Sequence, residues 1–148
     1  LSTIHTNSAW GTVARLIDMG VPPFLLAGTL SVSVAQRLVR LLCPHCKSKT
    51  AFNAIDYPKG YKPLKPVEYQ YISVGCAECY YTGYRGRKAV YEVIPVDYEM
   101  ADCIKNAIFD VSDKLKERKI NTLSDNAFYL FAEGTTSLDE IYSLLVNF

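Results

Sequence analysis

Four of the five cysteines form two Cys-x-x-Cys pairs, and they are the residues best suited to chemistry in this chain. The pairs are Cys43–Cys46 and Cys76–Cys79, and residues 47–75 separate them. Four thiolates that meet in space form the closed tetrahedral set that Zn²⁺ prefers in structural sites. A closed site leaves no coordination position for a substrate. The pattern therefore predicts a metal site that stabilises the fold, with Cys43, Cys46, Cys76 and Cys79 as ligands.

Other uses of these cysteines remain open. The gap between the pairs is longer than is usual for zinc ribbons. A redox dithiol needs only one Cys-x-x-Cys, usually at a helix start after a strand. A pair of disulfides requires an oxidising compartment, and no signal peptide or membrane-spanning run is visible. The fifth cysteine, Cys103, shares a predicted helix face with Met100 and Ile104, so we expect it to be buried.

His5 is the second candidate. It ends the short stretch 1–5, which we expect to be a strand, and Thr3, Thr6 and Asn7 lie near it in the sequence. In open α/β sheets ligands collect outside the carboxyl ends of the strands, where such a histidine could meet a phosphate or polarise a water. The alternative is a turn histidine that helps to cap the next helix, and the residues alone leave both possibilities open.

Basic residues flank both cysteine pairs: Arg37, Arg40, His45, Lys47 and Lys49 around the first, and Arg85, Arg87 and Lys88 around the second. They could form a nucleic-acid patch of the zinc-ribbon kind. They could instead compensate the formal charge of −2 on Zn²⁺ with four thiolates. Because the net charge of the chain is only +1, composition favours the second interpretation.

Composition indicates an ordinary globular protein. The chain has 148 residues, of which 49% are apolar and 21% charged, enough for one domain or two small ones. No Gly-x-x-x-x-Gly-Lys-Ser/Thr loop occurs. The glycine-rich stretch 82–87 follows a cysteine pair and does not join a strand to a helix, so it is not a phosphate-binding loop.

The pattern predicts an α/β fold whose first helix begins after Thr6-Asn7-Ser8 and ends near Gly20. An apolar stripe at a spacing of four residues predicts a second helix over 24–42. That stretch is interrupted by serines, so we do not expect it to span a membrane. Residues 47–68 should form a loop with one short helical turn, and 68–74 and 88–94 should be strands.

Helices are expected over the remainder. Asp97 should cap a helix that reaches about residue 109, and Ser112 a short helix that reaches Glu117. A third should run over 123–133, and Ser137 with Glu140 predicts a capping box for a last helix. We expect three segments: 1–42 in an α/β domain, 43–95 as a Cys₄ zinc-binding module, and 96–148 as an all-helical region.

Taken together, these features resemble the ATPases of bacterial type II secretion and type IV pilus assembly. Residues 1–9 resemble the His box of that family, residues 15–20 and 34–46 the approach to its tetracysteine motif, and residues 75–79, 82–87 and 90–92 the second half of that motif. Residues 122–125 and 133–140 are similar to its C-terminal helical region. The match departs from the family pattern at Trp10-Gly11 and at residues 119–121.

The resemblance implies a cytoplasmic, hexameric, RecA-like ATPase that drives a pilus-like filament, peripheral to the inner membrane through platform proteins. ATP and Mg²⁺ would be its cofactors, beside structural Zn²⁺. Because the Walker A loop of the family precedes the His box, we expect this chain to be the C-terminal part of a longer protein, inactive alone. Only His5 transfers as a nucleotide-site residue, near the γ-phosphate, and Cys43, Cys46, Cys76 and Cys79 transfer as zinc ligands.

The mechanism that follows has three parts. His5 senses the γ-phosphate, and the predicted helix 24–42 carries the shift towards the zinc module. The module and the C-terminal helices then act on a neighbouring subunit or a membrane partner. Two rival functions remain: a zinc-stabilised nucleic-acid-binding module, and a structural adaptor whose metal replaces a core. No nucleic-acid partner is expected on the ATPase hypothesis.

Overall fold

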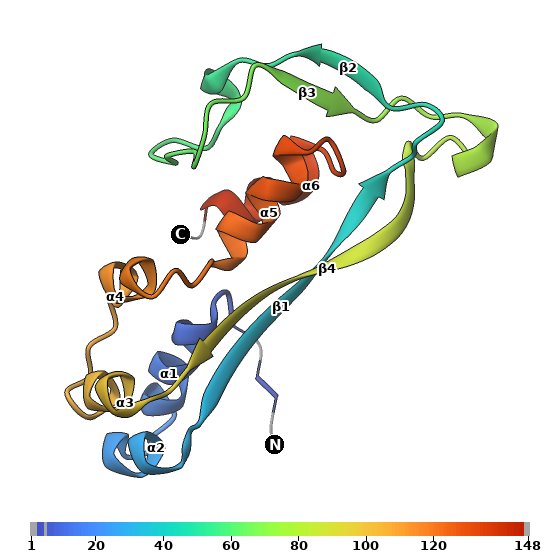
Figure 1. The fold of residues 1–148 in the computed structure, drawn as a ribbon. Coiled ribbons are helices and arrows are strands. Elements are labelled where there is room, and N and C mark those ends of the chain that lie inside the picture. The colour runs from blue at the N-terminus through green and yellow to red at the C-terminus, as the bar shows by residue number, and fades with distance from the viewer. Residues whose placement is uncertain (1–2, 5, 147–148) are drawn as a thin grey trace. The chain divides into compact units, whose positions relative to one another are not determined.

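The computed structural model describes residues 3–4 and 6–146, which form an α/β fold (Figure 1). The elements in chain order are α1 (Ala9–Asp18), α2 (Pro23–Thr29), β1 (Val32–Leu42), β2 (Ser48–Ala51), η1 (Ala54–Asp56), β3 (Tyr69–Ile72), η2 (Ala77–Cys79), β4 (Tyr84–Pro95), α3 (Tyr98–Lys105), α4 (Ser112–Glu117), α5 (Leu123–Ala132) and α6 (Leu138–Val146), where η marks a 3₁₀ turn.

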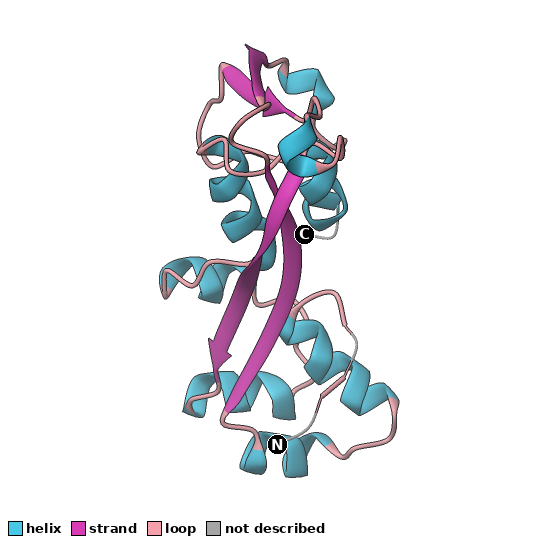
Figure 2. Cartoon of the chain, turned by 90° about the vertical axis from the view of Figure 1, so that its right-hand side faces the viewer, coloured by secondary structure: helices cyan, strands magenta, loops and turns pink. Residues whose placement is uncertain are grey.

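The strands form two small sheets. β1 pairs with β4, and their arrows run in opposite directions, twisting about one another (Figures 1 and 2). β2 pairs with β3 in an antiparallel register that places Ser48 opposite Ile72 and Ala51 opposite Tyr69. The strand expected over 68–74 is therefore confirmed as β3, and the strand expected over 88–94 is confirmed as part of the longer β4.

Two compact units divide the chain. One consists of Leu1–Gln36 and Tyr91–Thr122, and the other of Arg37–Val90 and Leu123–Phe148. β1 and β4 each contribute residues to both units. The division of the sequence into segments 1–42, 43–95 and 96–148 stays a prediction.

The helix expected over 24–42 is wrong. Only Pro23–Thr29 is helical, and Val32–Leu42 is the strand β1. A stripe at a spacing of four residues fits a helix, but four is also a multiple of two, so the same residues share one face of a strand. The β-branched Val32, Val34 and Val39 favour the strand. Leu30, which ends α2, is already extended, with φ −80° and ψ 116°.

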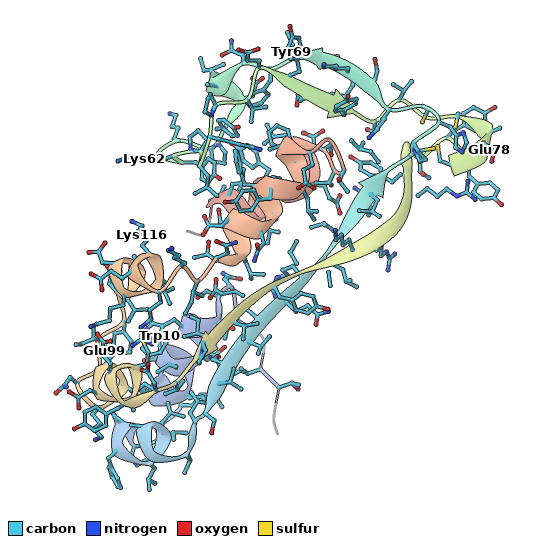
Figure 3. The ribbon with its side chains drawn as sticks, viewed as in Figure 1. Trp10, Lys62, Tyr69, Glu78, Glu99 and Lys116 are labelled. Atoms are coloured by element: carbon cyan, nitrogen blue, oxygen red, sulfur yellow. The ribbon has the colours of Figure 1, made fainter. Side chains whose placement is uncertain are left out.

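The first unit contains the helices α1, α2, α3 and α4, and α2 packs against α3. Ser8 caps α1 as expected, since its hydroxyl accepts a hydrogen bond from Gly11 N at 2.9 Å. Trp10 is buried, and its indole nitrogen donates to Ile108 O at 3.0 Å (Figure 3). Cys103 is 3% exposed, which confirms the expectation that it is buried. Residues 3 and 4 lie in neither helix nor strand, and the rest of the strand expected over 1–5 includes residues outside those described.

The caps of α3 and α4 agree with expectation to within one residue. The Asp97 carboxylate accepts from Met100 N at 3.0 Å at the start of α3, which ends earlier than predicted, at Lys105. At α4 the expected cap, Ser112, is instead the first helical residue. The Asp110 carboxylate accepts from both the backbone N–H and the hydroxyl of Ser112, so the capping oxygen comes from two residues upstream. Glu99 of α3 pairs with Lys114 and Arg118 (Figure 3).

The second unit packs aromatic side chains around α5 and α6. Phe128 and Phe131 of α5 are fully buried, as are Ile141 and Leu145 of α6. Residues from the segment expected to be a loop complete this core: Phe52, Tyr57 and Tyr61. The segment holds the expected helical turn, η1, but it also contains β2, which the sequence did not predict because Ser48–Ala51 is short and polar. Among the described residues, no helix combines the length and apolar character needed to cross a bilayer.

Candidate metal centre

The first cysteine pair lies directly after β1. Cys43 follows Leu42, is fully buried, and its backbone N–H donates to Gly83 O at 2.9 Å. The chain then turns sharply, because the N–H groups of Cys46 and Lys47 both donate to Cys43 O, at 3.4 and 3.0 Å. Pro44 and His45 occupy the turn. The strand thus fixes Cys43, and the turn brings Cys46 to the same side.

The second pair lies in a loop whose backbone is unusual. Cys76 caps the start of the single turn η2, Cys79 is its last residue, and Tyr80 and Tyr81 follow with positive φ of 51° and 60°. Such a conformation is rare for residues with a β-carbon and persists where the surrounding structure requires it. The loop closes with Gly83, at φ +78°, where a β-carbon would lie 2.5 Å from that of Ser73. Only glycine fits this close approach.

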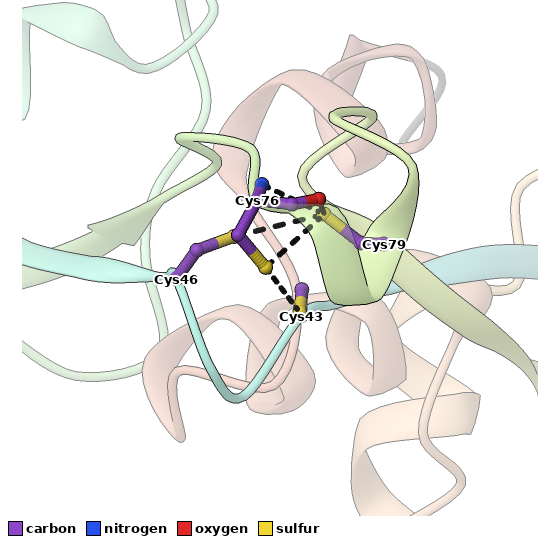
Figure 4. Close-up of side chains that lie close together, drawn as sticks. All are labelled: Cys43, Cys46, Cys76 and Cys79. Atoms are coloured by element: carbon purple, nitrogen blue, oxygen red, sulfur yellow. Dashed lines mark hydrogen bonds between the residues drawn. The ribbon is translucent and has the colours of Figure 1, made fainter.

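The four cysteine sulfur atoms lie within 4.8 Å of one another (Figure 4). The Cys43–Cys76, Cys46–Cys79 and Cys76–Cys79 separations are 3.9, 3.8 and 3.8 Å. Zn–S bonds of about 2.3 Å in a tetrahedron require sulfur atoms about 3.8 Å apart. A disulfide would require about 2.05 Å, and all of these cysteines are free. The four residues expected as ligands therefore come together, at a spacing that could hold a metal ion.

Backbone N–H groups surround the sulfur atoms. Cys79 Sγ accepts from Cys76 N at 3.2 Å and from Gly83 N at 3.3 Å, and Cys46 Sγ accepts from Gly75 N at 3.3 Å. Such hydrogen bonds orient thiolate ligands and tune the site. The cysteine pattern alone did not predict the contacts of these glycine amides with the sulfur atoms, although the Gly-Cys-x-x-Cys-x-x-x-Gly spacing carries the signal.

The same contacts govern the acidity of the thiols. Burial raises the pKa of Cys76 to about 11. Burial also opposes ionisation of Cys79, but the amides of Cys76 and Gly83 together with the neighbouring thiols outweigh it and lower its pKa to about 6. A metal ion that binds all four sulfur atoms must displace the protons of the thiols.

Four of the eight basic residues near the cysteines have acidic or aromatic partners within the second unit. Arg40 pairs with Glu140 and lies 4.2 Å from the centre of the Tyr84 ring. The ammonium groups of Lys47 and Lys49 lie over the rings of Tyr71 and Tyr69, at 4.6 and 4.4 Å. Arg85 pairs with Glu78 at 3.6 Å. Glu78 belongs to η2 (Figure 3). The choice between a nucleic-acid patch and charge compensation at the cysteines stays open.

His5 lies outside the described residues, but the segment that follows it is well defined. Thr6 Oγ1 hydrogen bonds to Ser8 O at 3.0 Å and to Thr12 Oγ1 at 2.8 Å. Ala9, the first residue of α1, donates its N–H to Glu92 Oε1 at 2.7 Å. Sequence reasoning missed Glu92 because its partner lies 83 positions away.

Comparison with known proteins identifies the family. The Type II/IV secretion system protein family matches residues 1–143. The chain belongs to this family. The resemblance drawn from the His box and the cysteine motif is thereby confirmed.

Similar proteins include both secretion and pilus members of the family. The chain is 34% identical to the type II secretion system protein E of Aeromonas hydrophila over 95% of its own length and 28% of that protein. It is 48% identical to the protein of the same name from Klebsiella pneumoniae over 66% of its own length and 19% of that protein. It is 39% identical to the type IV pilus assembly ATPase PilB of Myxococcus xanthus over 95% of its length and 26% of that protein. The chain thus spans less than a third of the length of these relatives.

Proposed function

We propose that this chain is the C-terminal part of a cytoplasmic ATPase that powers type II protein secretion or type IV pilus assembly. The observation that carries the proposal is the match to the family over residues 1–143, with relatives named both as secretion proteins and as pilus assembly ATPases. In this proposal the parent binds ATP and Mg²⁺, assembles as a hexamer, and works at the inner membrane through platform proteins.

The nucleotide role falls to His5, which would lie near the γ-phosphate at the end of the α/β domain. The chain contains no Walker A loop, so we expect it to bind or hydrolyse no ATP by itself. In the turn after His5, Thr6 Oγ1 donates to Ser8 O and Ser8 Oγ accepts from Gly11 N. These hydrogen bonds support the role of His5, because a phosphate-sensing side chain must be held in place.

The four cysteines would hold structural Zn²⁺, which supplies a cross-link between the end of β1 and the loop before β4. Cys43, Cys46, Cys76 and Cys79 provide a complete set of sulfur donors at tetrahedral spacing. A set of four protein ligands leaves no position for a reacting molecule, so the site would stabilise the module and take no part in hydrolysis. The helices α5 and α6 pack within the same unit and would complete the C-terminal helical region.

The β1–β4 pair would take the place of the predicted helix 24–42 in the mechanism. β1 runs without interruption to Leu42, directly before Cys43, and β4 begins at Tyr84, directly after Gly83. A displacement at the nucleotide would thus pass along paired strands towards the cysteine loops.

Steady-state hydrolysis by the full-length protein tests the proposal. His5→Ala should lower kcat about 100-fold, the loss typical of one removed group that stabilises transition-state charge, while ATP affinity changes little. An equal loss of binding and turnover would remove the sensing role of His5. A full-length protein that hydrolyses no ATP in the presence of Mg²⁺ would contradict the ATPase function itself.

A further inference from the structure

Glu92 is a buried carboxyl group in an otherwise apolar row. It lies in β4 between Val90 and Ile94, which face the same side of the strand, and these three residues are 3%, 3% and 0% exposed. A valine or isoleucine would suit such a position. Burial of a carboxyl group is costly unless the group is hydrogen-bonded. Glu92 must therefore have a hydrogen-bond partner, with which an apolar side chain could form no hydrogen bond.

That partner is the beginning of α1. Glu92 Oε1 accepts a hydrogen bond from Ala9 N at 2.7 Å, and Ala9 is fully buried. The first N–H groups of a helix have no acceptor within the helix, so they need one from elsewhere. α1 has no acidic residue in its own first turn. Glu92 therefore supplies, from a distant strand, an acceptor oxygen for the first N–H group of α1.

The other strand of the pair, β1, also contacts Ala9. Ser33 of β1, which is 5% exposed, donates its hydroxyl to Ala9 O at 2.7 Å. The backbone N–H and C=O of Ala9 are thus tied to β4 and to β1 respectively. With Thr6 bonded to Thr12 and Ser8 bonded to Gly11, the whole turn over residues 6–9 is held by side chains.

We propose that Glu92, assisted by Ser33, is a positioning residue for the nucleotide site: it holds the start of α1 so that His5, four positions upstream, meets the γ-phosphate. This role rests on the proposed function of His5. Glu92 touches no reacting atom. Its effect on hydrolysis passes through the turn that it anchors.

A double-mutant cycle in the full-length ATPase tests this role. Glu92→Leu fills the site without an acceptor, Glu92→Gln keeps an acceptor oxygen, and Glu117→Gln, an exposed residue of α4, is the matched control. We expect Glu92→Leu to lower kcat at least about tenfold with little change in the KM for ATP, because misplacing a reacting group costs one to two orders of magnitude. Glu92→Gln should recover part of the loss, and the control should show none.

The decisive comparison is made in the His5→Ala background. If Glu92 acts through His5, Glu92→Leu costs little further turnover there. Equal losses in both backgrounds would overturn the proposal, as would a loss confined to KM. Retained hexamer and unfolding temperature exclude general damage to the fold.

Amide hydrogen exchange of residues 6–12 tests the anchoring of α1 separately from the proposed sensing role of His5. Glu92→Leu should speed exchange in that segment, whether or not His5 matters for hydrolysis. Unchanged exchange overturns the anchoring, and faster exchange without any loss of turnover overturns the positioning role. If His5→Ala leaves turnover intact while exchange behaves as expected, the sensing role of His5 has failed and the positioning role fails with it, but the anchor of α1 stands.

Discussion

Glu140 accepts hydrogen bonds from both the backbone and the side chain of Arg40. One carboxylate oxygen accepts from Arg40 N at 2.9 Å, and the other accepts from Nε at 2.8 Å and lies 2.7 Å from a terminal guanidinium nitrogen. Arg40 belongs to β1 and Glu140 to the first turn of α6. The glutamate that the sequence predicted for a local capping box is therefore used to attach the last helix to a strand.

Removal of this contact should destabilise the protein. We expect Glu140→Ala to lower the free energy of unfolding by about 1–2 kcal/mol, because a charge-assisted hydrogen bond to the backbone is lost together with a half-exposed ion pair. Urea unfolding measures the change, with the exposed neighbour Asp139→Ala as control. A loss equal to that of the control would show that the carboxylate contributes nothing.

The same pair predicts a dependence on acid. Burial raises the pKa of Glu140, but the hydrogen bonds from Arg40 lower it by more, and the net shift is downward. The folded state thus binds the proton less tightly than the unfolded chain, so the stabilisation is present at neutral pH and is lost as the pH falls below about 4. Unfolding of wild type and Glu140→Gln across that range should converge at low pH. A constant difference would contradict the assignment.

Metal removal tests the cysteine cluster. The protein as purified should contain one zinc ion per chain, and Cys43→Ser or Cys79→Ser should abolish it, because four sulfur ligands are needed to close the site. Cys103→Ser is the matched control, since Cys103 lies in the other unit. Metal analysis and chelator-induced unfolding provide the measurements. Unchanged metal content in the Cys43 or Cys79 variant would exclude the four-sulfur site.

Gly83 should be far less tolerant of alanine than Gly28. Alanine at Gly83 meets a positive φ of 78° and Ser73 at 2.5 Å, whereas Gly28 in α2 has open space around it. We expect Gly83→Ala to cost about 1–3 kcal/mol and to weaken metal binding, because the amide of Gly83 also bonds Cys79 Sγ. Gly28→Ala should stabilise by up to about 1 kcal/mol. Thermal unfolding of both variants measures the two changes in stability. Equal changes for Gly83→Ala and Gly28→Ala would contradict the prediction.

The aromatic core of the second unit should lose stability in alkali. Burial raises the pKa of Tyr57 and of Tyr61 to about 12, above the usual value near 10. The folded state holds these protons more tightly, so its stability falls as the pH rises from about 10 to 12. Tyr57→Phe should flatten that fall. At neutral pH it should cost nothing or stabilise, because among the described residues the buried Tyr57 hydroxyl finds no hydrogen-bond partner. Tyr80→Phe, at a residue 89% exposed, should leave the alkaline profile unchanged.

Local patterns in the sequence predicted local features of the structure. The Cys-x-x-Cys spacing identified the four residues that come together, and Ser8 and Asp97 marked helix starts correctly. The prediction of a helix over 24–42 failed because the spacing of its apolar residues satisfies the periods of both a helix and a strand. Pairing with β4 decides between the two. The anchoring roles of Glu92 and Glu140 could not be predicted from local patterns, because their partners lie 83 and 100 positions away in the sequence.

The anchoring of Ala9 has a consequence for how the two long strands find each other. Ser33 and Glu92 must face Ala9, while ten residues after Ser33, and nine before Glu92, Cys43 N must meet Gly83 O. A slip of one residue between β1 and β4 would turn every side chain of the shifted strand to the opposite face. A mispaired chain would then lose the contacts of Ser33 and Glu92 with Ala9, and its four cysteine sulfur atoms would no longer lie together. A metal ion bound by the four sulfur atoms would therefore favour the correct strand pairing, because only molecules in that register bring the four sulfur atoms together.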